Sequence, residues 1–244
     1  MLEAFGWGLL AASSLVVGAL VVRVHDPHPR TLGLVMGFGS GVLLAAVSFE
    51  LVEEAVGVSG GLGGTAAGFF AGALTFFVGD TAIARLGYRD RKDIDAQPTE
   101  AAPLAIVLGA ALDGIPESAV LGLTIVTTGE IGVAMLVAIF VSNVPEAIAA
   151  TSGLAATGWR FANTLRLWTA IALLSAVASA AGFALLDDAS PTTVAFVLAF
   201  AGGAILTMLS TSMMPEAYEH AGRAVGLLTT FGFALAFAIN WLEG

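Results

Sequence analysis

Polar residues interrupt two otherwise apolar stretches of the sequence, near the middle of each stretch. The first stretch carries two carboxylates, and the second carries a hydroxyl, an amide and a carboxylate: Asp113 and Glu117, then Ser142, Asn143 and Glu146. Residues three or four positions apart lie on one face of a helix, so each set can present its oxygen atoms together. Carboxylate, amide and hydroxyl oxygens suit hard divalent cations. The pattern therefore predicts a cation site made by two facing helices.

The three carboxylates have no basic residue nearby in sequence to neutralise them. No Lys or Arg stands near the middle of any apolar stretch. A charged group at the centre of a bilayer costs roughly 3 kcal/mol or more. Asp113, Glu117 and Glu146 therefore need a cation or protons as compensation. The alternative interpretation is that they are protonated and hydrogen-bonded within a packed core.

A proline stands directly before a glutamate in both stretches, at Pro116 and Pro145. A proline inside a helix lacks an N–H group and frees the carbonyl four residues earlier. The carbonyls of Leu112 and Val141 are therefore additional candidate ligands. The alternative is an ordinary helix kink, which is common in membrane helices.

The composition predicts a membrane protein. The sequence is 57% hydrophobic and 11% charged, unlike an ordinary soluble domain. A helix needs roughly 20 apolar residues to cross a bilayer. Stretches of this length occur at 4–22, 31–52, 62–84, 103–127, 131–157, 164–186, 192–215 and 222–242. They are continuously apolar rather than alternating, which makes a β-barrel a poor alternative. We therefore expect an all-α fold of eight transmembrane helices, in a single domain over residues 1–244.

The basic residues predict the orientation of these helices. All of them fall in alternate connections, the longest of which is a charged loop at about 86–101: Arg23, Arg30, Arg85, Arg89, Arg91, Lys92, Arg160, Arg166 and Arg223. By the positive-inside rule these connections are cytoplasmic. Both termini then lie outside a cell membrane. We expect the first helix to remain in the mature chain, because Glu3 stands where a signal peptide carries a basic residue.

The second and seventh predicted helices resemble each other. Residues 38–55 and 200–217 align without a gap, with coincidences at Phe38/Phe200, Gly41/Gly203, Leu44/Leu206, Ser48/Ser210, Glu54/Glu216 and Ala55/Ala217. These helices run in opposite directions in the predicted topology, which indicates inverted repeats. In such transporters the substrate site lies at the midplane where the repeats meet. Chance similarity between apolar helices is the alternative.

The motifs DGIPES at 113–118 and SNVPEA at 142–147, with GGAILTMLSTSMMPEAYEH at 202–220, resemble a known family. On these motifs, and on the glycine-rich start of its second helix, the chain resembles the ZIP (Zrt/Irt-like) family of divalent-metal permeases over nearly its whole length. The resemblance implies eight helices, both termini outside, a homodimer, and uptake of Zn²⁺, Fe²⁺, Mn²⁺ or similar ions. It places the metal at the midplane, between the fourth and fifth helices.

The resemblance also assigns roles to individual residues. Glu117 and Glu146 match the family's metal-binding glutamates, whereas Asp113 and Ser142 stand where the family usually has histidine, and Gly114 where it has asparagine. Imidazole suits Zn²⁺, and a set of oxygen ligands suits Mn²⁺, Mg²⁺ or Fe²⁺. Zinc also accepts carboxylates, so the preferred metal stays open. The sixth helix lacks an acid at mid-span, so we expect a single site.

A second group of candidate ligands stands at the inner end of the seventh helix: Glu216, Glu219 and His220. In the family resemblance, a segment bearing histidine at this place fits the release of metal. A solvated cluster without function is the alternative. No catalytic cofactor is expected at either place.

The same features argue against other functions. The sequence has no HExxH motif and no cysteine, and its three histidines lie near one membrane face, so we do not expect an enzyme. The formal net charge of -10 argues against a nucleic-acid partner. The sequence thus predicts a transporter that takes up divalent metal cations. The alternative is a non-transporting relative that senses metal or acts as a scaffold.

Overall fold

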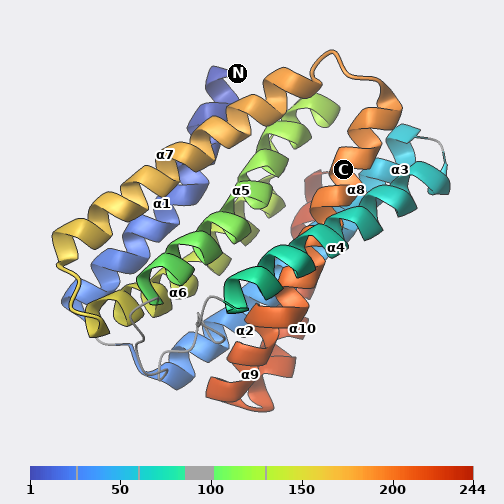
Figure 1. Ribbon diagram of the computed structural model, residues 1–244. Coiled ribbons are helices and arrows are strands. Elements are labelled where there is room, and N and C mark those ends of the chain that lie inside the picture. Colours follow the sequence, from blue (N-terminus) through green and yellow to red (C-terminus); the bar gives the residue numbers. More distant parts are fainter. Residues whose placement is uncertain (26, 60, 86–101, 130, 244) are drawn as a thin grey trace.

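The computed structural model describes residues 1–25, 27–59, 61–85, 102–129 and 131–243, which fold almost wholly into helices (Figure 1). The α-helices are α1 (Leu2–Val24), α2 (Pro29–Ala46), α3 (Glu54–Ser59), α4 (Leu62–Arg85), α5 (Ala102–Thr128), α6 (Val133–Ala156), α7 (Phe161–Leu186), α8 (Pro191–Met208), α9 (Met214–Ala221) and α10 (Ala224–Glu243). Two π-helical segments, η1 (Val47–Glu53) and η2 (Leu209–Met213), follow α2 and α8. The described residues contain no strand, and the all-α prediction is confirmed.

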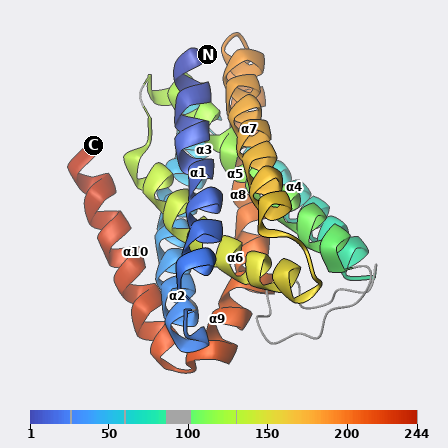
Figure 2. The same cartoon turned by 90° about the vertical axis from the view of Figure 1, so that its left-hand side faces the viewer.

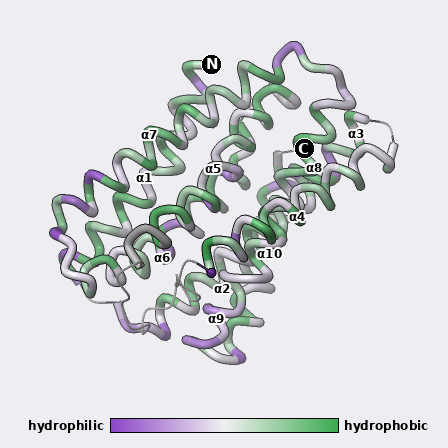
Figure 3. Tube along the Cα trace, viewed as in Figure 1, coloured by the Kyte–Doolittle hydropathy of each residue, from purple (hydrophilic) through white to green (hydrophobic). Residues whose placement is uncertain are grey.

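The described helices form eight spans that are long and apolar enough to cross a membrane. Two of them are composite: α2, η1 and α3 make the span Pro29–Ser59, and α8, η2 and α9 make the span Pro191–Ala221. Hydrophobic residues run along the helices, and hydrophilic residues gather largely near their ends (Figure 3). The chain is therefore a multi-pass membrane protein. The predicted loop at 86–101 lies outside the described residues.

The second and seventh spans are longer than the sequence predicted. We expected them to end at 52 and 215, because the apolar run stops there and acidic residues follow. The helices instead continue to Ser59 and Ala221. Backbone hydrogen bonds do not require apolar side chains, so the helix extends by about two turns beyond its hydrophobic part.

The two composite spans share their local geometry at aligned positions. Each begins with a proline in its first turn, at Pro29 and at Pro191. The π segments begin at Val47 and at Leu209, which are aligned residues in the predicted repeat. A π segment is a rare irregularity of the hydrogen-bond ladder. Its occurrence at equivalent positions is not explained by a shared apolar composition, and it supports the repeat.

The packing of these spans repeats as well. Helix α2 packs against α10, and α8 packs against α4. The Phe38 carbonyl lies against Gly232, and the Phe200 carbonyl lies against Gly72, so closely that a Cβ atom on either glycine would overlap the carbonyl. Phe38 and Phe200 are aligned residues, and α2 and α8 run in opposite directions (Figures 1 and 2). The inverted repeat predicted from the sequence is therefore present in the packing.

Helices α1, α5, α6 and α7 pack against one another and form a second group beside α2, α4, α8 and α10. Within it, Trp168 Nε1 on α7 donates a hydrogen bond of 2.9 Å to Thr151 Oγ1 on α6. Ser179 Oγ donates to the Ala4 carbonyl of α1 at 2.8 Å. Such interhelical bonds stabilise helix packing where no water competes. This group carries the candidate site, because the polar residues of both motifs lie on α5 and α6.

Candidate metal centre

Helices α5 and α6 remain α-helical through their prolines. Pro116 lies inside α5, and Pro145 lies inside α6. The irregular π segments occur in the two composite spans instead, so the helices that carry the candidate site are not the interrupted ones. Proline still cannot donate a hydrogen bond, which leaves the carbonyls of Leu112 and Val141 as candidate ligands.

All the predicted site residues of α5 and α6 are buried. Their exposed fractions are 2% for Asp113, 1% for Glu117, 1% for Ser142, 4% for Asn143 and 5% for Glu146. Carboxylates are rarely buried to this extent unless a partner or a proton offsets the cost. The two motifs therefore place their oxygen atoms inside the helix bundle and away from lipid.

The surroundings of the Asn143 side chain bear on whether a ligand binds at this site. Its carboxamide makes no hydrogen bond within the part of the chain that the structure describes. An amide has two donors and two acceptor lone pairs, which leaves the Asn143 side chain able to bind a ligand. A bound ion, with the water that it carries, would supply the missing partner. The neighbouring Ser142 differs, because its Oγ donates to the Ile139 carbonyl at 3.1 Å and keeps only lone pairs to offer.

Two small residues let other helices approach the site. A Cβ atom on Gly39 of α2 would lie 3.2 Å from Ser142 Cα, so the α2 backbone passes close to this face of α6. On the α5 side, Ser175 Oγ of α7 lies 3.8 Å from the position that a Cβ on Gly114 would occupy. Ser175 is buried, and we did not propose it as a site residue. The sequence feature that could have identified Ser175 is its position at the middle of its span, facing the glycine of DGIPES.

The described residues do not contain three His, Cys, Asp or Glu side chains close enough together to hold a metal ion. Asp113, Glu117 and Glu146 are all buried, yet they do not form such a group. Each of them has interactions of its own within the protein. A metal ion in this arrangement would need the amide, hydroxyl and carbonyl oxygens of α6 as well as carboxylates.

The inner end of the seventh span separates its three candidate residues. Glu216 is 6% exposed, whereas Glu219 is exposed and His220 is partly buried. His220 Nε2 is itself buried and has no hydrogen-bond partner among the described residues. Helix α2 passes close by, since a Cβ on Gly33 would lie 2.9 Å from the His220 Cβ. These residues thus do not form a ready three-ligand group, and their role stays a prediction.

Comparison with known proteins shows what the chain is similar to. No family model matches the chain. A protein of Arabidopsis thaliana named "Putative zinc transporter At3g08650" is 29% identical over 217 residues, which cover 87% of this chain and 34% of that protein. The chain spans about a third of the length of this curated relative. This similarity agrees with the family resemblance carried by DGIPES and SNVPEA.

Proposed function

We propose that this ZIP-like protein takes up divalent metal cations across a cell membrane, through a single site on α5 and α6. The observation that carries the proposal is the buried carboxamide of Asn143, which lacks a partner among the described residues. It lies one turn from Glu146, so an amide and a carboxylate oxygen share one face of α6. Metal as the cargo is supported by the relative, which is named as a zinc transporter.

The ligand set favours hard ions. The candidate donors on α5 and α6 are carboxylate, hydroxyl, amide and carbonyl oxygens, and the histidines of the chain are His25, His28 and His220. Oxygen ligands favour Mn²⁺ or Fe²⁺ over later transition metals, although Zn²⁺ also binds carboxylates. An ion with two positive charges would draw Asp113, Glu117 and Glu146 toward itself and offset the cost of burying them.

Uptake is the proposed direction because of the proposed orientation. The described basic residues lie in or beside alternate connections between the spans. Examples are Arg23 in the last turn of α1 and Arg160 at the N-cap of α7. Under the positive-inside rule that side is cytoplasmic. Glu216, Glu219 and His220 then stand on the cytoplasmic side, where an ion is released.

A labelling experiment tests this orientation. The chain has no cysteine, so single cysteines can be introduced without background labelling. We expect Asp188→Cys to react with an impermeant thiol reagent added to intact cells, and Asn163→Cys to react only after the cells are opened. Both positions are exposed and lie near opposite ends of α7. Labelling of Asn163→Cys from outside would reverse the topology.

Uptake into proteoliposomes tests the function. We expect the purified protein to carry divalent cations into vesicles. Unlabelled Mn²⁺ should inhibit the uptake of Fe²⁺ more strongly than unlabelled Zn²⁺ does, and unlabelled Fe²⁺ should likewise inhibit the uptake of Mn²⁺ more strongly. Replacing oxygen donors by imidazoles in Asp113→His with Ser142→His should shift this preference toward Zn²⁺. Protein-free vesicles control for leakage.

The outcomes separate the two candidate functions. Binding of metal to the purified protein without uptake would support a sensor or scaffold in place of a transporter. An unchanged metal preference in the folded double variant would show that Asp113 and Ser142 do not contact the ion.

A further inference from the structure

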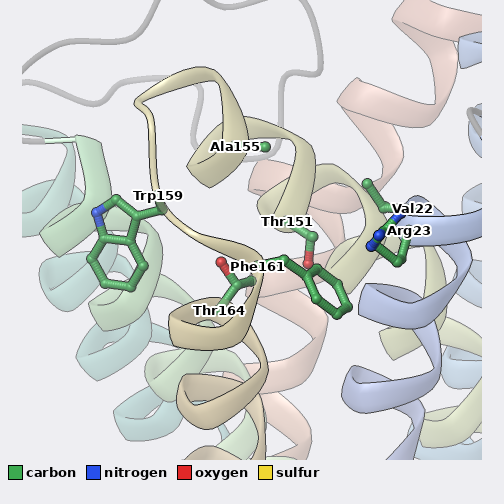
Figure 4. Close-up of a pocket in the computed structure, with 7 residues that line it drawn as sticks. All are labelled: Val22, Arg23, Thr151, Ala155, Trp159, Phe161 and Thr164. Atoms are coloured by element: carbon green, nitrogen blue, oxygen red, sulfur yellow. The ribbon is translucent and has the colours of Figure 1, made fainter.

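A pocket lies where α1 and α6 end and α7 begins, apart from the candidate metal centre. It has a volume of about 220 Å³ and is lined by Val22, Arg23, Thr151, Ala155, Trp159, Phe161 and Thr164. Figure 4 shows Arg23 at one end of the pocket and Trp159 at the other, with Phe161 and Thr164 between them. The helix ends place it at the level where a span leaves the bilayer.

Two hydroxyl groups in this pocket have donors to spare. Thr164 is 2% exposed, and its hydroxyl has no hydrogen-bond partner in the described part of the chain. Thr151 is also 2% exposed; its Oγ1 accepts a bond from Trp168 Nε1, and its own O–H donates to no described group. Both line the pocket, which therefore offers donors to a ligand that accepts.

Positive charge accompanies these donors. The Arg23 guanidinium lies over the Phe161 ring, 6.0 Å from its centre. Stacking on the ring leaves the N–H groups at the edge of the guanidinium available to a ligand. Arg23 makes no salt bridge with a described residue. Helix α7 begins beside the pocket, and its N-cap Arg160 provides no side-chain cap for the first N–H groups. A helix N-terminus favours negative charge.

The remaining lining suits a molecule that is only partly polar. Val22, Ala155, Trp159 and Phe161 present apolar and aromatic surface. Aromatic residues are favoured at the membrane interface, where one part of a molecule is apolar and the other is charged. Basic pockets between helices near the cytoplasmic surface recognise anionic lipid head groups. A free inorganic ion would leave most of this surface without a contact.

We propose that the pocket formed by Arg23, Thr151 and Thr164 binds the phosphate group of an anionic membrane lipid. The guanidinium and the two hydroxyls donate to the phosphate oxygens, and Trp159 and Phe161 contact the glycerol region and the first carbons of the chains. The lipid joins α1, α6 and α7 at one end of the helix group. The proposal does not depend on the transport site, so its test uses binding and not transport.

The test is native mass spectrometry of the detergent-purified protein titrated with phosphatidylglycerol, compared with phosphatidylcholine of the same chains. We expect phosphatidylglycerol to bind more tightly, and Arg23→Gln to weaken it about tenfold, as loss of a hydrogen bond to a charged group does. Thr164→Val keeps the shape and removes the hydroxyl, and we expect a loss of about threefold. Arg166→Gln is the matched control, because Arg166 is an exposed base on α7 outside the pocket.

Each result decides the proposal. Equal losses in Arg23→Gln and Arg166→Gln would show attraction by surface charge alone and overturn it, as would unchanged binding in Arg23→Gln. Displacement of the lipid by inorganic phosphate at the same concentration would assign the pocket to a soluble anion and overturn the lipid. Arg23 is exposed, so Arg23→Gln keeps the test valid even if Thr164→Val fails to fold.

Discussion

Glu117→Gln and Glu146→Gln are each expected to reduce metal uptake at least tenfold while the purified protein keeps its fold. The amide retains the size and shape of the carboxyl group and removes its charge. If the carboxylate binds a divalent cation, the substitution removes most of its attraction for the ion. An interaction with a charged group contributes about 1.5–3 kcal/mol to the binding free energy, which corresponds to a loss of tenfold or more. A glutamic acid that is already protonated in a packed core loses little. The substitution therefore separates the two interpretations of these buried residues.

The measurement is uptake into proteoliposomes, with thermal unfolding of the purified variants as the check on folding. Glu53→Gln is the matched control, because Glu53 is exposed on another span and undergoes the same chemical change. Near-normal uptake in both site variants would favour protonated core residues. Loss in Glu117→Gln alone would place the ion on α5. We do not expect that, because a hard divalent ion takes about six oxygen ligands and α5 offers few.

The sequence predicted most of the fold because a bilayer allows few structures. Without water in the hydrocarbon region, only helices or closed barrels satisfy the backbone, and continuous apolar stretches choose between them. The number of spans and the repeat followed from that constraint and from one gapless alignment. The ends of the second and seventh spans could not be predicted in this way. The length of an apolar stretch reflects the thickness of the bilayer, whereas a helix can continue beyond it. The π segments at Val47 and Leu209 had no local signal beyond the repeat itself.

For the site, the sequence predicted which residues are buried but not how they meet. The cost of an intramembrane charge was enough to predict that Asp113, Glu117 and Glu146 avoid lipid, and all three are buried. Their mutual distances depend on how α5 and α6 are rotated, which spacing along one helix does not encode. The Arg23 pocket was equally hidden, because Arg23 on α1 is distant in sequence from Thr151 on α6 and Thr164 on α7.

Gly72→Ala and Gly232→Ala are expected to destabilise the protein by similar amounts, about 1–3 kcal/mol each, as overpacking of a close contact does. A Cβ on Gly72 would overlap the Phe200 carbonyl, and one on Gly232 would overlap the Phe38 carbonyl. A backbone carbonyl cannot rotate away as a side chain can, so the helices must separate. These contacts are equivalent in the inverted repeat, and the two losses should therefore match.

Thermal unfolding in one detergent, with Gly63→Ala on α4 and Gly226→Ala on α10 as controls, measures this effect. A Cβ at either control position would meet nothing within 4 Å, so alanine there should be neutral or slightly stabilising, as expected from helix propensity. For a chain of this size each kcal/mol lowers Tm by roughly 2–4 °C. A loss at Gly72 without one at Gly232 would show that only the α4–α8 contact is tight. Equal stability in all four variants would mean that neither helix pair packs as closely as the repeat requires.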